Sequence, residues 1–186
     1  MFKKLLVIAI LIPASSFATD ISGRLTITPM VGLERVQKFQ PTTSMKTRAV
    51  YGVTAVYKFP VTALEVEYTH AQDSSDDAAT STSYEDSEDK LRLGLRGSFN
   101  VGNFLGYYLR GGAQYRKNKY TKTVSGQAST TDSSSKVQPY VGTGVELKVA
   151  NFLSVTASVL ATFTPTDDPN LKDYELQPAV GLNLRF

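Results

Sequence analysis

The chain has 186 residues but no cysteine and a single histidine, His70. Without cysteine there is no disulfide, so stability must come from hydrogen bonding and packing. Any imidazole chemistry would have to use His70. Long apolar runs are scarce as well. After the first eighteen residues, none approaches the roughly 20 residues that a membrane-spanning helix needs.

The first eighteen residues have the pattern of an export signal. Lys3 and Lys4 precede an apolar run over residues 5–12, and Pro13 ends that run. Ser16 and Ala18 place small residues where a signal peptidase reads them. We expect cleavage after Ala18, which gives a signal peptide of residues 1–18 and one domain of residues 19–186. Without a cysteine near that bond, a lipoprotein anchor is excluded.

Charge does not point to a nucleic-acid partner. The whole chain has 20 Lys and Arg against 17 Asp and Glu, a net charge of +3. Loss of Lys3 and Lys4 with the signal lowers the basic count from 20 to 18 and the net charge to +1. The mature chain is therefore close to neutral, and no nucleic-acid binding is expected.

Strict alternation of apolar and polar residues dominates the rest of the chain. Leu91, Leu93 and Leu95, for example, alternate with Lys90 and Arg92. Such a period of two is typical of β-strands, whose neighbouring side chains point to opposite faces. The pattern predicts eight strands, over residues 21–34, 47–59, 62–70, 90–99, 104–116, 137–149, 152–164 and 173–186.

The connections between these segments alternate in length. Short turns are expected at 59–61, 100–103 and 150–151, and long hydrophilic loops at 37–46, 71–88, 117–136 and 165–172. Short turns at one end and long loops at the other are typical of bacterial outer-membrane barrels. We therefore predict an all-β fold, an eight-stranded antiparallel up-and-down transmembrane β-barrel with both termini in the periplasm.

A soluble lipocalin-like barrel would also have eight amphipathic strands, with the apolar face inward. Two features favour a membrane barrel. Aromatic residues on the apolar parity gather near strand ends, as interfacial girdles do. Glycines on the polar parity, such as Gly52, Gly94 and Gly144, leave room for long charged side chains inside a narrow barrel.

Two short motifs resemble a known family. Val180, Leu182, Leu184 and Phe186 look like the terminal strand that the assembly machinery of outer-membrane barrels recognises. Residues 138–145 (QPYVGTGV) resemble a strand common in the small OmpA-like and OmpX-like barrels. The resemblance implies a location in the outer membrane of a Gram-negative bacterium. Its implied partners are outer-membrane lipid, lipopolysaccharide and the barrel assembly machinery.

The charged residues on the polar parity predict a charged interior. Because an unpaired buried charge is very costly, these residues are expected to form ion pairs. The expected ion-pair network consists of Glu65, Glu67, Lys90, Arg92, Arg96, Arg110 and Glu146. Such a network favours a plugged barrel with a structural or adhesive surface role. A narrow porin for small solutes is the alternative.

The loops carry uneven charge, with acidic residues in 71–89 and lysines in 117–136. Such runs of charge usually lie on a solvated surface. More specific interpretations of these charges are contact of the lysines with lipopolysaccharide, or contact of the loops with a host or phage surface. No spacing matches an EF-hand loop, so no metal or cofactor is expected.

An enzyme that modifies lipid A is the third alternative, since some eight-stranded barrels do so with a histidine, a serine and an acidic residue. Here it would use His70, which is expected on the lipid side, with Asp73 and Ser74 nearby. Asp73 and Ser74 fall in a predicted loop and do not share the strand face of His70. No catalytic residue is therefore assigned, and a non-enzymatic role is expected.

Overall fold

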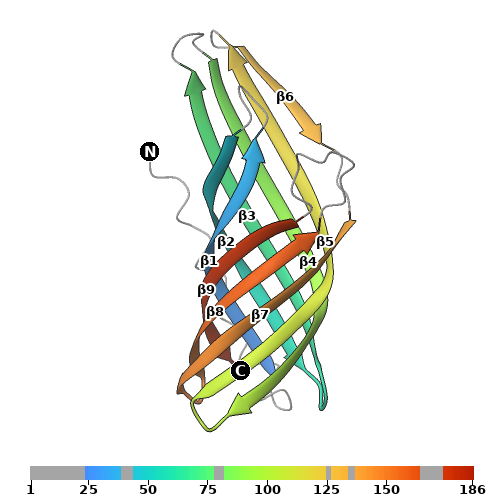
Figure 1. The fold of residues 1–186 in the computed structure, drawn as a ribbon, viewed down its shortest axis with the longest axis vertical. Coiled ribbons are helices and arrows are strands. Elements are labelled where there is room, and N and C mark those ends of the chain that lie inside the picture. Colours follow the sequence, from blue (N-terminus) through green and yellow to red (C-terminus); the bar gives the residue numbers. More distant parts are fainter. Residues whose placement is uncertain (1–23, 39–43, 78–81, 125–126, 134–136, 164–173) are drawn as a thin grey trace.

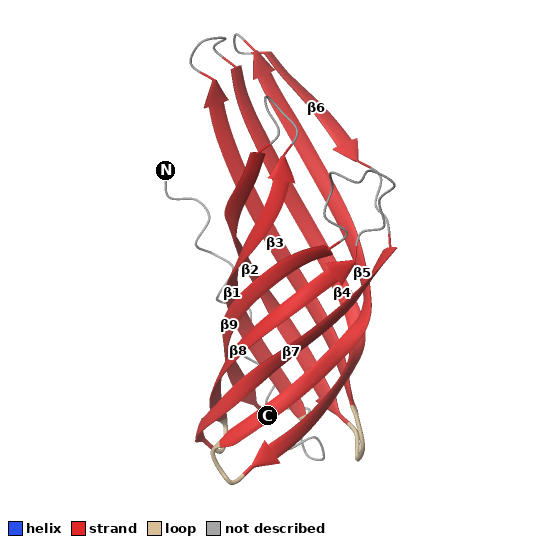
Figure 2. Ribbon diagram, in the orientation of Figure 1, coloured by secondary structure: helices blue, strands red, loops and turns tan. Residues whose placement is uncertain are grey.

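The computed structural model describes residues 24–38, 44–77, 82–124, 127–133, 137–163 and 174–186. Within these residues every regular element is a strand, as Figure 2 shows. The described part holds no helix that is long and apolar enough to cross a membrane. The strands are β1 (Leu25–Lys38), β2 (Ser44–Lys58), β3 (Ala63–Asp77), β4 (Thr82–Val101), β5 (Leu105–Val124), β6 (Gln127–Ser133), β7 (Val137–Ala150), β8 (Leu153–Phe163) and β9 (Tyr174–Arg185).

Eight of these strands form a closed ring. The order is β4-β3-β2-β1-β9-β8-β7-β5, and pairing of β4 with β5 closes it. All neighbours are antiparallel, and β1 meets β9 through pairs such as Val31 with Val180. The predicted eight-stranded barrel is confirmed. Figure 1 shows its tilted strands, with the C-terminus near the end that carries the short turns.

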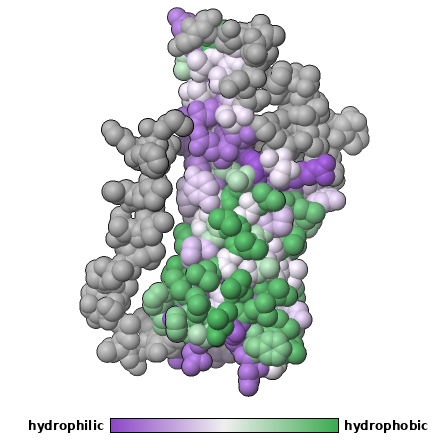
Figure 3. All heavy atoms as spheres, turned by 90° about the vertical axis from the view of Figure 1, so that its left-hand side faces the viewer, coloured by the Kyte–Doolittle hydropathy of each residue, from purple (hydrophilic) through white to green (hydrophobic). Residues whose placement is uncertain are grey.

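Side chains alternate between lumen and exterior along each strand. On β4, Leu91, Leu93 and Leu95 are 50%, 56% and 59% exposed, whereas Arg92 between them is 1% exposed. In Figure 3 the apolar side chains gather in the lower part of the molecule, with hydrophilic residues above them and at its foot. On β5 the apolar outer face runs from Tyr107 to Tyr115, which matches the roughly 9–11 residues of a membrane-spanning strand.

Exposed aromatic side chains border this apolar belt at both ends. Near the long-loop end they are Tyr51, Tyr68, Tyr115, Phe163 and Tyr174. Near the short-turn end they are Phe59, Phe99, Phe104, Phe152 and Phe186. Two such girdles are expected where a barrel meets the two membrane–water interfaces.

Two of the predicted loops are wrong over much of their length, and the predicted loop 37–46 is wrong at both ends, because β1 reaches Lys38 and β2 begins at Ser44. The stretch 71–88 contains the ends of β3 and β4, which pair with each other as far as Asp77 with Thr82. The stretch 117–136 contains the end of β5 and the additional strand β6, which pairs with β5 from Asn118 to Val124. Neither face of these segments lies against lipid, so their polar residues show no period-two apolar pattern. Without that pattern, the sequence did not predict them as strands.

These extensions form a four-stranded antiparallel sheet above the barrel wall, visible at the top of Figure 1. We call it the projecting sheet. It consists of β6 and of the parts of β3, β4 and β5 that extend past Gln72, Glu88 and Arg116 toward the long-loop end. The rings of Tyr84 and Tyr120 lie 6.0 Å apart across β4 and β5. Lys122 lies 5.7 Å from the centre of the Tyr84 ring. Ring contact and a cation–π pair therefore support strands that lie beyond the closed barrel.

Glycine makes room for one large side chain in the lumen. Tyr140 is 1% exposed, and its hydroxyl lies against the α-carbon of Gly94. A Cβ built on Gly94 would touch that hydroxyl and would lie 2.5 Å from the carbonyl oxygen of Gly111. The glycine is therefore needed for close packing between β4, β5 and β7.

This packing predicts the effect of a single methyl group. We expect Gly94→Ala to lower the free energy of unfolding by about 1–3 kcal/mol, the usual cost of overpacking. Gly97→Ala, in the same strand, is the matched control, because its Cβ would meet no atom within 4 Å. Urea unfolding of the two refolded variants, followed by heat-modifiable gel migration, measures the difference. Equal midpoints for both would contradict the packing role.

Candidate functional site

Charged side chains fill the lumen in three groups along the barrel. The mid-barrel cluster consists of Glu65, Glu67, Arg92 and Arg110. The long-loop cluster consists of Glu34, Arg48, Glu88, Lys90, Arg116 and Glu175. A third group, around Glu146, Arg96 and Arg185, lies toward the short turns.

Arg92 is the centre of the mid-barrel cluster. Its guanidinium forms an ion pair with Glu67 on the neighbouring strand β3. It also donates to Gln114 on β5 at 2.6 Å and to Gln177 on β9 at 2.8 Å. One side chain from β4 thus contacts three other strands, and one of them lies across the lumen.

Arg110 completes this cluster from β5. It pairs with Glu65 at 2.9 Å and also with Glu67, so Glu67 is shared by two arginines. Thr54 donates a further hydrogen bond of 3.0 Å to Glu67. Both carboxylates are fully buried, at 0% exposure. Such burial is tolerated only with paired charges and satisfied hydrogen bonds.

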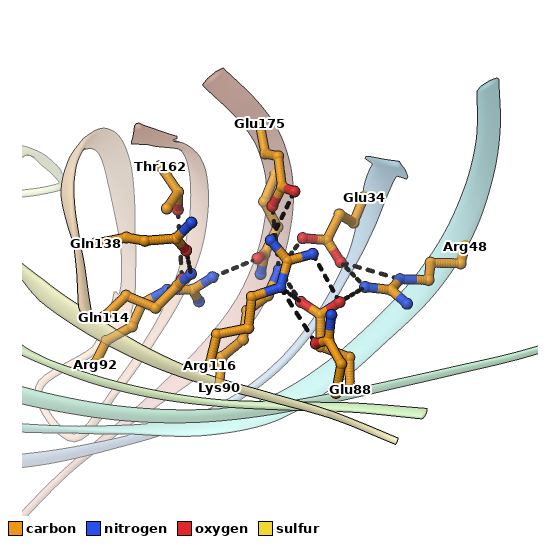
Figure 4. A network of polar contacts seen from close by, with 12 residues as sticks. Glu34, Arg48, Glu88, Lys90, Arg92, Gln114, Arg116, Gln138, Thr162 and Glu175 are labelled. Carbon is orange, nitrogen blue, oxygen red and sulfur yellow. Dashed lines mark hydrogen bonds and ion pairs between the residues drawn. The ribbon is translucent and has the colours of Figure 1, made fainter. Parts of the chain in front are cut away.

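The long-loop cluster, seen in Figure 4, is held together by ion pairs across several strands. Arg48 contacts Glu34 at 2.9 Å and also contacts Glu88. Lys90 contacts Glu88 at 2.8 Å and also contacts Glu34. Arg116 joins the cluster to β9 through a 2.8 Å pair with Glu175.

The carboxylates of Glu34, Glu88 and Glu175 lie close enough together to resemble a metal site, with ligand atoms within 4.8 Å of one another. The cations Arg48, Lys90 and Arg116 lie among them and balance their three charges. A divalent cation would have to displace these side chains or lie beside them. The donor set therefore does not fit a metal ion.

The predicted network residues lie in different groups. Glu65, Glu67, Arg92 and Arg110 meet in the mid-barrel cluster, whereas Lys90 lies in the long-loop cluster. Arg96 lies 3.7 Å from both Glu65 and Glu146, and so links the middle of the lumen to its short-turn end.

Sequence reasoning missed several members of the long-loop cluster. Glu34, Arg48, Arg116 and Glu175 follow the same inward parity as the predicted network, so periodicity alone could have found them. Glu88 fell in a stretch that was predicted to be a loop, so its parity carried no meaning there.

Space in the middle of the lumen is small. A cavity of about 20 Å³ lies between the side chains of Met30, Glu67, Tyr108 and Arg110. This is room for about one water molecule. The described lumen is therefore blocked in the middle by paired side chains.

His70 lies on the outer face, and its neighbours differ from those expected. Its Nδ1 lies 2.7 Å from Oδ1 of Asp89 on β4, and Tyr68 donates a 2.6 Å hydrogen bond to that same oxygen. Asp73 and Ser74 instead pair with Asp86 and Glu85 in the β3–β4 register. Among the described residues, no serine or threonine hydroxyl bonds His70, so a nucleophile beside the imidazole is missing there.

The mid-barrel cluster predicts a large and specific loss of stability. Glu67→Gln removes the charge shared by Arg92 and Arg110, and breaking a buried pair in this way costs about 3–5 kcal/mol. Glu85→Gln, on the exposed face of β4, is the matched control, and surface changes of this kind stay within about 0.5 kcal/mol. Urea unfolding in detergent measures both variants. A midpoint for Glu67→Gln close to that of the control would disprove the bracing role.

Comparison with known proteins covers almost the whole chain. A family model described as "Outer membrane protein beta-barrel domain" matches residues 5–186. No curated protein sequence matches the chain.

Solved structures with a similar fold share little sequence with it. Neisserial surface protein A is 15% identical, with a TM-score of 0.62 over 89% of this chain and 98% of that one. The attachment invasion locus protein Ail of Yersinia pestis is 14% identical, with a TM-score of 0.58 over 89% of this chain and 99% of that one. The N-terminal β-barrel domain of OprF from Pseudomonas aeruginosa is 14% identical, with a TM-score of 0.56 over 89% and 98% of the two chains. At these identities the likeness shows the fold alone.

Proposed function

Because the chain belongs to the family of outer-membrane β-barrel proteins, we propose that it is a non-enzymatic surface barrel with a structural and adhesive role. Its location is the outer membrane of a Gram-negative bacterium. The projecting sheet carries the proposal. It places four strands beyond the apolar belt, where a partner outside the cell can reach them.

The orientation follows from the two ends of the barrel. The long-loop end, with the projecting sheet, faces outward, and the short turns and both termini face the periplasm. The signal peptide of residues 1–18 is removed during export. The assembly machinery then binds the last strand through Val180, Leu182, Leu184 and Phe186. Val180 and Phe186 are 54% and 52% exposed on the outer wall, which suits such contact.

Lipopolysaccharide surrounds the outer rim in this orientation. Lys117 and Lys119 follow Tyr115 on the outward face of β5, directly above the apolar belt. Lipid phosphates lie at that height, so these two lysines are placed to contact them.

The adhesive partner lies beyond the cell surface and contacts the projecting sheet. The sheet has an open edge at β6, which among the described strands pairs only with β5. Ail of Yersinia pestis has also been solved with the heparin analogue sucrose octasulfate. A sulfated polysaccharide on a host cell is therefore the first partner to test.

Shortening the projecting sheet tests the proposal. We expect cells that display a variant with residues 73–86 and 118–135 replaced by short Gly/Ser turns to lose most of their adhesion to cultured host cells. Glu88 and Arg116 remain, so the long-loop cluster and the barrel are retained, and heat-modifiable migration checks this.

A variant shortened only within residues 165–172 is the matched control and keeps its adhesion. Equal adhesion of the two variants would refute the proposed role of the projecting sheet. Soluble heparin then shows whether the partner is a sulfated polysaccharide, since it competes only in that case.

The paired lumen predicts the electrical behaviour of the barrel. We expect the refolded protein in planar lipid bilayers to show no stable open state, because the mid-barrel cluster blocks the path. Single-channel recording measures this. A steady open level that changes in Arg92→Ala would instead support the narrow porin.

A further inference from the structure

The short-turn end of the lumen opens into a second, larger cavity. Its volume is about 270 Å³, and it lies between the β2–β3 turn and the ends of β4, β5, β7 and β9. We call it the short-turn vestibule. Its lining includes the charged residues Lys58, Arg96, Glu146, Lys148 and Arg185.

Charge in this cavity is not balanced. Among the described residues that line it, Glu146 is the only carboxylate, against four cations. Glu146 is already bound by Arg185, by Ser154 through a 2.7 Å hydrogen bond, and by Arg96 at 3.7 Å. Neither Lys58 nor Lys148 pairs with any carboxylate in the described part of the chain. The two clusters deeper in the lumen hold their charges in pairs, whereas this one keeps a positive excess.

A polar group without a partner also lies in the vestibule wall. Thr26 lines the cavity and is 5% exposed, yet its hydroxyl has no hydrogen-bond partner among the described residues. A buried hydroxyl without a partner costs free energy unless a ligand or water satisfies it. The amides of Asn100 and Asn183 line the same cavity.

We propose that the short-turn vestibule is an anion-binding site for a phosphate group. Two ammonium groups without carboxylate partners, together with two arginines, supply charge-assisted donors, and Thr26 offers a hydroxyl donor. A cleft with an excess of one sign of charge within low-dielectric walls concentrates counter-ions. The phosphate is either free in solution or part of a lipid headgroup, since the mouth opens at the level of the short turns.

Calorimetric titration of the refolded mature barrel with inorganic pyrophosphate, in an uncharged detergent at low ionic strength, tests the site. We expect one binding event per barrel, weakened at least tenfold in the double variant Lys58→Gln/Lys148→Gln. Arg35→Gln/Lys122→Gln is the matched control, because it removes the same charge from exposed side chains at the long-loop end, which do not line the vestibule, and leaves pyrophosphate affinity unchanged. Heat-modifiable migration shows that both variants fold.

Two outcomes would overturn the proposal: no pyrophosphate binding by the wild-type barrel, or equal weakening in both double variants, which would mean a general charge effect. The source of the phosphate is tested in nanodiscs. If lipid headgroups occupy the vestibule, phosphatidylglycerol lowers the apparent pyrophosphate affinity relative to phosphatidylcholine in the wild type, and the difference disappears in Lys58→Gln/Lys148→Gln. Equal affinity in the two lipids identifies the soluble anion.

Discussion

Backbone hydrogen bonding in a medium without water is the constraint that governs this molecule. Hydrocarbon offers no partner to an exposed N–H or C=O, so a sheet that crosses it must have no open edge. Pairing of β4 with β5 and of β1 with β9 meets that demand. Once the ring is closed with its apolar face toward lipid, the polar face must point inward. The charged lumen is therefore a direct result of closure.

This demand for internal backbone hydrogen bonds applies only within the membrane. Above the girdle of Tyr51, Tyr68 and Tyr115, water can satisfy backbone groups, and an open edge is tolerated there. The projecting sheet, which is not closed, lies at that height. β3, β4 and β5 thus run without a break from the closed wall within the membrane into the open sheet in water.

Lipid-facing strands could be predicted from the sequence because one of their faces is uniformly apolar. The alternation of Leu91, Leu93 and Leu95 with Lys90 and Arg92 gave both the strand and the direction of each side chain. The upper parts of β3, β4 and β5 lack that contrast, so they resembled loops. Pairing across the lumen was beyond prediction for another reason. Contacts such as Arg92 with Gln177 depend on the tilt and stagger of the closed barrel, which local periodicity does not encode.

Among the described residues, β1 and β9 form the fewest residue pairs of any two neighbouring strands in the barrel wall, and we call this contact the seam. Arg92 on β4, by bonding Gln177, ties β9 to the opposite wall, while Thr28 on β1 donates a 2.7 Å hydrogen bond to Asn183 on β9. Opening the barrel at this seam must therefore break hydrogen bonds inside the lumen as well as backbone hydrogen bonds along the wall. The last strand is thus held at the seam by side chains from β1 and from the opposite wall as well as by its few backbone pairs with β1.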